Sequence, residues 1–457
     1  MFTLLLICIC SFLVLIWHSR LVGLSLGLPI AYLFSMLLQH LPGAFAHLVG
    51  GDFFLDSSAT QIGLRLTTIG TVCFVLGAIL AQRVVRISAD TSGTHWLDDA
   101  KTLRFAIYCL VGGWLVACVT TFLGRIPSLG AAIEKAGAIW ILGVLIGFVA
   151  SVRGGRYAHA LLWLAALSVY PLVVLITGGF LSFGSTSVFV AMSALLVFVR
   201  SHLRAYGGVA LFSLFCFLGF LSYFQNRDDI RESVWGGHGL DERLERCAKI
   251  ITDLKWFNPN DADQLTALDA RMNQSYFAGL AAQRIESGAV GFLHGRSVWE
   301  GLQALVPRAL WPAKPIFAGS SQMIREFSGI GVNEDTTFGV GQVMELYVNF
   351  GAPSVVVGFL LFGFAYGLLD RNAAGALQAG EFGRVFIWFL PAMGMLAPLA
   401  SIAEVTGNVA AALMGAFVWR YAWRLLNAMP SAMRSKEAKP AGGRRRTVRP
   451  VPVEPEL

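Results

Sequence analysis

Three polar side chains recur at helical spacing in the segment FGVGQVMELYVNFGAP (338–353). Gln342, Glu345 and Asn349 follow an i, i+3, i+7 pattern, so a helix places all three on one face. A carboxylate at the edge of a membrane is costly unless it faces protein or water. The stripe therefore fits two roles. It either caps and joins helices through hydrogen bonds, or it forms the polar lining of a cavity.

Two cations lie in a stiff, proline-rich segment, LVPRALWPAKP (305–315). Its three prolines favour extended backbone and remove amide donors, so Arg308 and Lys314 are held on a rigid strap. One role for this strap (residues 305–315) is an interfacial anchor whose cations touch lipid phosphates. The other is a pair of cations aimed at a bound phosphate or pyrophosphate, since a guanidinium engages two oxygens at once.

Further cations occur in YFQNRDDIRES (223–233) and in AAQRIESG. Arg227 and Arg231 are i, i+4 neighbours, so they share a helix face. Local salt bridges with the adjacent acids are one role for this pair, and binding of an anion is the other. Arg284 is typical of a solvated helix face and is a further candidate for anion binding.

The whole chain is poor in charge and rich in long apolar runs. Of its 457 residues 56% are hydrophobic and only 14% charged, whereas about a quarter is charged in a soluble protein. Backbone polar groups in lipid must be satisfied within each segment, so the runs predict membrane-spanning helices and an all-α, polytopic membrane protein. About eleven spans are predicted, near residues 2–17, 21–39, 61–82, 105–123, 137–152, 157–178, 185–199, 205–224, 347–369, 385–403 and 406–423.

The distribution of cations predicts which way the chain is inserted. Eleven spans place the two termini on opposite sides, and cations favour cytoplasmic connections. The short connections on the C-terminal side hold most of the cations, whereas those on the other side hold only Arg125 and Lys135. We therefore expect a cytoplasmic C-terminus, a periplasmic N-terminus and a bacterial cytoplasmic (inner) membrane location. The net charge of +7 comes largely from loops and tail, so it does not indicate nucleic acid as a partner.

This topology divides the chain into four parts. They are eight spans in 1–224, a large periplasmic loop in 225–346, three spans in 347–426 and a basic disordered cytoplasmic tail in 427–457. Within the loop, helical periodicity predicts helices over 241–256, 261–288 and 295–306, the last of them at the membrane interface. The Asp261–Asp263 pair is typical of a helix start. The sequence has no HExxH, GxSxG or zinc spacing, so we expect no metal and no cofactor.

Two motifs resemble those of a known family. The run PR-x-LWP-x-KP (307–315), followed by E-x-Y-x-NFG (345–351), resembles the oligosaccharide repeat-unit polymerases of bacterial surface polysaccharides, the Wzy type. The predicted architecture, with one large outer loop between the eighth and ninth spans, is also similar to theirs. Many of these polymerases carry a GSRG-like motif at the seventh span. Here FGSTS stands in its place without the arginine, so no role is carried over to that position.

The resemblance implies a glycosyltransferase of the GT-C type that polymerises repeat units at the outer leaflet. Its substrates and partners would be undecaprenyl-pyrophosphate-linked glycans and membrane lipids, with a chain-length regulator and a flippase as further partners. Charge grows on the departing pyrophosphate, and preorganised cations stabilise it. We therefore expect Arg308 and Arg227 to act on the pyrophosphate and Glu345 to act as base or to orient the acceptor. Supporting substrate contacts are expected from Arg231, Arg284, Lys314, Gln342, Tyr347 and Asn349.

Three other functions fit parts of the pattern. An O-antigen ligase of the same fold would use the same donor but pass the glycan to a lipid core. A polysaccharide transporter or flippase would need polar or broken helices near the midplane, and the predicted spans are almost entirely apolar there. A non-enzymatic scaffold in an export complex is the third.

Overall fold

The computed structural model describes residues 1–49, 55–85, 100–123, 129–178, 182–199, 201–252, 256–308, 310–315, 319–331 and 339–428. Within these ranges the chain is helical and contains no strand, so the predicted all-α class is confirmed. The predicted disordered tail lies almost wholly outside the described residues, which end at position 428.

Among the described residues, eight helices are long and apolar enough to cross a membrane. They are α1 (Phe2–Val22), α2 (Leu28–Val49), α3 (Ser57–Val84), α4 (Ala100–Leu123), the pair α5 (Leu129–Gly137) and α6 (Ile139–Arg153) taken together, α9 (His202–Trp235), α16 (Ala352–Gln378) and α18 (Ile402–Ala428). Shorter apolar stretches lie in α7 (Tyr157–Gly178), α8 (Ser182–Phe198) and α17 (Phe382–Met395), where the remaining spans were predicted. A polytopic membrane protein is confirmed, and the count of eleven spans stays a prediction.

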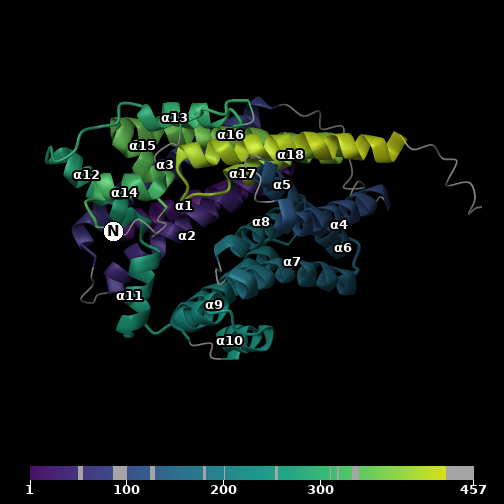
Figure 1. Cartoon of the computed structure of the whole chain (residues 1–457), viewed down its shortest axis with the longest axis horizontal. Coiled ribbons are helices and arrows are strands. Elements are labelled where there is room, and N and C mark those ends of the chain that lie inside the picture. Colours follow the sequence, from purple (N-terminus) through teal and green to yellow (C-terminus); the bar gives the residue numbers. More distant parts are fainter. Residues whose placement is uncertain are drawn as a thin grey trace, which may run out of the picture.

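The remaining helices gather mainly at one end of the bundle. They are α10 (Leu240–Thr252), α11 (Ala262–Arg271), α12 (Gln274–Glu286), α13 (Arg296–Ala304), α14 (Ser320–Ser328) and α15 (Gln342–Phe350). Figure 1 shows α11, α12, α14 and α15 on the side of the N-terminus, while the long helix α18 points its C-terminal end the opposite way. We call the end with Met1 and α11–α15 the loop end.

Helix α12 packs directly against α3, so the large loop is part of the bundle and not a separate layer. The contact is made by backbones. A Cβ added at Gly63 would overlap the carbonyl oxygen of Ser275, and one added at Gly279 would overlap that of Ala59. Small residues allow this close approach of two helices, as in membrane helix pairs.

Two predicted elements of the loop differ from the observed ones. The expected single helix over 261–288 is wrong, because α11 ends at Arg271 and α12 begins at Gln274. Asn273 stands between them and caps α12 by accepting a hydrogen bond from the backbone N–H of Tyr276, at 3.3 Å. A side chain that caps a helix competes with helix continuation, which periodicity does not register. The predicted cap at Asp261 is confirmed, since it accepts from Asp263 and Gln264 N–H.

The ninth span also begins later than predicted. The range 347–369 was expected to be one apolar helix, but Gly351, with φ +71° and ψ −155°, separates α15 from α16. Glycine adopts this backbone conformation without a Cβ penalty, and Pro353 then starts α16. The polar stripe therefore lies on its own nine-residue helix, outside the long span.

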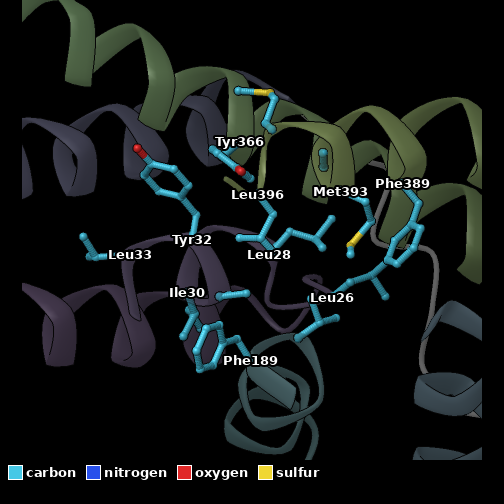
Figure 2. Close-up of a cluster of buried hydrophobic side chains, with 14 of the residues drawn as sticks. Leu26, Leu28, Ile30, Tyr32, Leu33, Phe189, Tyr366, Phe389, Met393 and Leu396 are labelled. Atoms are coloured by element: carbon cyan, nitrogen blue, oxygen red, sulfur yellow. The ribbon is translucent and has the colours of Figure 1, made fainter. Parts of the chain in front are cut away.

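The core lies between helices that are distant in sequence. Figure 2 shows Tyr32 of α2 beside Tyr366 of α16, with Phe389 and Met393 of α17 and Phe189 of α8 in the same cluster. The rings of Tyr32 and Tyr366 are 4.8 Å apart between centroids. This packing holds α2, α8, α16 and α17 together. It thereby fixes the position of α15 and of its polar face.

A buried carboxylate closes the opposite end of the bundle. Asp370 of α16 is fully buried, and its Oδ1 accepts hydrogen bonds from the backbone N–H groups of Leu26 at 2.9 Å and Leu28 at 3.2 Å. Because these amides belong to the connection between α1 and α2 and to the first residue of α2, Asp370 ties the start of α2 to the end of α16.

Candidate functional site

The polar stripe of α15 is completely buried. Gln342 is 1% exposed, and Glu345 and Asn349 are 0% exposed. The amide of Gln342 donates to the carbonyls of Ala397 at 2.8 Å and Ala400 at 2.7 Å. Its oxygen accepts from the hydroxyl of Tyr32 at 3.0 Å. Gln342 therefore joins α15 to α2 and to the connection between α17 and α18.

Glu345 joins α15 to the beginning of α18. Its Oε2 accepts a hydrogen bond from the backbone N–H of Ile402 at 2.6 Å, at the N-terminus of α18, where a negative charge is favoured. Its Oε1 is buried and has no hydrogen bond of normal geometry among the described residues. Burial raises the pKa of Glu345 to about 7, against the lowering effect of the Ile402 amide and of the nearby Ser297 hydroxyl. The carboxyl can thus exchange a proton near neutral pH.

Asn349 joins α15 to the start of α13. It accepts from the backbone N–H of Gly295 at 3.0 Å and donates to the hydroxyl of Ser297 at 2.8 Å. It also donates to the carbonyl of Glu345 at 2.7 Å. Of the two roles open to the stripe, the structure shows hydrogen bonds that join helices. A water-filled lining is not seen, because none of the three side chains is exposed.

Tyr347 lies on another face of α15. Its ring is buried and its hydroxyl is 3.4 Å from Oε1 of Glu286, at the end of α12. Burial raises the pKa of Tyr347, and the charge of Glu286 raises it further, so it is a neutral donor. Tyr347 therefore links α15 to α12 as a hydrogen-bond donor and carries no charge.

The two cations of the strap form hydrogen bonds with backbone carbonyls in or next to the strap. The guanidinium of Arg308 donates to the carbonyls of Lys314 at 2.8 Å and Pro315 at 3.3 Å. The ammonium of Lys314 donates to those of Ala304 at 3.0 Å and Val306 at 2.9 Å. Burial lowers the pKa of Lys314, and the neighbouring Arg308 lowers it further. The strap is thus a closed turn whose cations replace the amide donors that proline removes.

Arg227 and Arg231 lie on α9, which continues through the predicted domain boundary at 224 to Trp235. A third cation, Arg271 at the end of α11, joins them. Arg227 and Arg271 lie 5.9 and 5.3 Å from the centroid of the Phe224 ring. Partial burial lowers the pKa of Arg271, and repulsion by Arg227 and Arg231 lowers it further. We call Arg227, Arg231 and Arg271 the arginine cluster.

The acid next to Arg227 pairs with it only weakly. Asp228 is 3.8 Å from Arg227, but its side chain is 92% exposed, so the pair is weak. Asp229 faces Arg246 of α10 at 4.0 Å. Three cations are thus held within repulsion of one another, and such a group of cations suits an anion-binding surface.

The structure divides the predicted cations among several places. The arginine cluster lies on α9 and α11, the strap follows α13, and Arg284 lies on the last turn of α12 against Gly329. In Figure 1, α9 and α13 lie at opposite edges of the molecule. The expectation that Arg227 and Arg308 grip one pyrophosphate together therefore does not fit this arrangement.

Sequence reasoning missed Arg271, which belongs to the predicted helix over 261–288 and has no second cation three or four residues away. Only the packing of α11 beside α9 brings it to Phe224. No group of three or more His, Cys, Asp or Glu side chains in the described ranges is arranged to hold a metal ion. Comparisons of the chain with protein-family models, curated proteins and solved structures find no match.

Proposed function

We propose that this protein is a GT-C-like glycosyltransferase that polymerises undecaprenyl-pyrophosphate-linked repeat units at the outer leaflet of the bacterial inner membrane. In this proposal the loop end faces the periplasm and the C-terminus faces the cytoplasm. The motifs at 307–315 and 345–351 motivate the choice of reaction. The observation that carries it is the arginine cluster, which lies where a membrane-spanning helix continues beyond its apolar part.

The position of the cluster suits a lipid-linked anion. The apolar part of α9 covers Ala205–Phe224, and the first arginine of the cluster follows three residues later. Several apolar side chains of α9 are exposed, among them Leu211 and Phe215, so this face of the helix meets lipid. A ligand with its tail in the bilayer would therefore bring its phosphates to the level of the guanidinium groups.

The chemistry needs a stabilised leaving group. The bond between the anomeric carbon of the donor and the pyrophosphate oxygen breaks, and that oxygen keeps the electron pair. The acceptor hydroxyl forms the new glycosidic bond and gives up its proton. Guanidinium groups fixed near the pyrophosphate lower the energy of its developing charge. Phe224 contributes by holding two of these groups in place.

The predicted base role of Glu345 remains part of this proposal. A carboxyl with a pKa of about 7 matches the requirement for a proton acceptor at neutral pH. Its burial and its bond to Ile402 support a second role, in which it positions α15 against α18. Because one oxygen is engaged by the amide, only Oε1 would receive the proton.

The test is complementation in a host that lacks its own polymerase. We expect Arg227→Gln combined with Arg271→Gln to reduce long-chain polysaccharide about 100-fold or more, since each charge-assisted contact is worth about 1.5–3 kcal/mol. Arg246→Gln is the matched control, because this arginine lies at the same end but is paired with Glu242 at 2.9 Å. Glycan ladders separate polymerase from ligase: loss of a polymerase leaves single repeat units, whereas loss of a ligase leaves lipid-linked polymer. Normal ladders from the double variant, at normal protein level, would refute the proposal.

A further inference from the structure

Two arginines at the loop end carry buried N–H groups without partners. Nε of Arg284 and one terminal nitrogen (NH1) of Arg325 are inaccessible to solvent and make no hydrogen bond. Within the described ranges neither side chain makes a hydrogen bond or an ion pair. A buried donor without an acceptor destabilises the fold, so each such group requires an explanation.

The two side chains come from helices that pack together. Arg284 lies on the last turn of α12, and Arg325 lies on α14, which contacts α12. The guanidinium of Arg284 lies against Gly329, where an added Cβ would be 2.5 Å from its terminal nitrogen. Arg325 lies in the last turn of α14, four residues before Gly329, so the two arginines belong to the same end of this helix.

Other partly buried arginines show what a structural guanidinium does in this fold. Arg20 donates to the carbonyl oxygens of Leu196 and Val199, and Arg371 donates to that of Val85, although NH1 of Arg371 is also buried without a hydrogen bond. Arg284 and Arg325 differ in that neither side chain makes any hydrogen bond in the described ranges. The C-terminus of α14 offers a favourable field for one cation. It does not account for two cations at one helix end, neither of which makes a hydrogen bond in the described ranges.

We propose that Arg284 and Arg325 together bind a phosphate-containing anion, at a site separate from the arginine cluster. The planar forks of two guanidinium groups fit the oxygens of a phosphate or a diphosphate. The assignment of a substrate to each site rests on the proposed function, in which the reaction uses two lipid-linked diphosphates. We assign the arginine cluster to the first and the pair Arg284–Arg325 to the second, the acceptor.

The experiment measures binding and not polymerisation, so that it does not depend on the proposed reaction. The full-length protein carrying Arg227→Gln and Arg271→Gln is placed in neutral phosphatidylcholine nanodiscs and titrated calorimetrically with inorganic pyrophosphate. We expect binding to persist in this background. Adding Arg284→Gln or Arg325→Gln should weaken it about tenfold each, the loss of one charge-assisted contact. Arg296→Gln is the control, because Arg296 is exposed and paired with Glu300 at 3.0 Å.

Two outcomes would overturn the site. They are absence of pyrophosphate binding in the starting background, and unchanged affinity when both Arg284 and Arg325 are replaced. If the combined variant does not fold, Arg325→Lys alone tests the site, because lysine keeps the positive charge but lacks the planar guanidinium. Pyrophosphate affinity equal to that of the parent would then contradict the proposal. Polymer that still forms normally in the Arg227 and Arg271 variant would refute the proposed function alone and leave this result standing.

The same titration distinguishes the sources of the anion. Undecaprenyl diphosphate in the discs should compete with pyrophosphate at this site, whereas discs with phosphatidylglycerol should not. If phosphatidylglycerol competes as well as the undecaprenyl lipid, the site binds headgroups and the assignment to an acceptor substrate is wrong.

Discussion

Replacing Gly63 by alanine should separate the large loop from the membrane helices. The added Cβ would overlap the carbonyl oxygen of Ser275, which is backbone and cannot rotate away. Helices α3 and α12 must therefore move apart. That movement stretches two hydrogen bonds across the same interface, between Ser275 and Thr67 at 3.3 Å and from Asn273 to Thr60 at 2.9 Å.

The size of the effect follows from three contributions. Overpacking costs about 1–3 kcal/mol. The two stretched hydrogen bonds contribute about 1 kcal/mol each. Alanine gains about 1 kcal/mol over glycine in a helix. The free energy of unfolding should thus fall by about 2–4 kcal/mol.

The assay is denaturant or thermal unfolding of the purified protein in detergent, with Gly219→Ala as the control. Gly219 lies inside α9, and an added Cβ there meets nothing within 4 Å. The control should be as stable as the parent or about 1 kcal/mol more stable. Equal stability of the two variants would refute the backbone contact between α3 and α12.

Two further predictions concern buried carboxyls. Glu345 has a folded pKa of about 7 and an ordinary value of 4.5, so its protonated form stabilises the fold fully below about pH 4.5. That contribution, about 3 kcal/mol, is lost as pH rises through 7, and Glu345→Gln should abolish this part of the pH dependence of unfolding. A parallel pH profile for parent and variant would contradict the burial of the carboxyl. Asp370→Ala should lower the free energy of unfolding by about 3 kcal/mol, because two amides lose their acceptor. Asp370→Asn, which keeps an acceptor oxygen, should lose less, and equal losses for the two variants would argue against this role.

Local sequence was sufficient for the all-α class and for the membrane class. Hydrophobicity acts residue by residue, so apolar runs predicted where the helices lie. The starts and ends were harder. The break at Asn273 and the turn at Gly351 depend on a capping side chain and on a positive φ, which hydrophobic periodicity does not encode.

The stripe of α15 illustrates how far spacing reaches. The i, i+3, i+7 pattern correctly placed Gln342, Glu345 and Asn349 on one helical face. It left the role of that face open, because the partners come from distant segments. Ile402, for example, is 57 residues from Glu345.

The sequence by itself determined that this chain is a helical membrane protein whose candidate polar groups and cations lie mainly in its large loop, because composition and periodicity are local properties. Only the tertiary structure decided which cations meet. It joined Arg271 to Arg227 across Phe224, brought Arg325 to the same helix end as Arg284, and turned Arg308 back onto its own strap. Helix packing sets these distances, and packing depends on contacts between residues far apart in the chain.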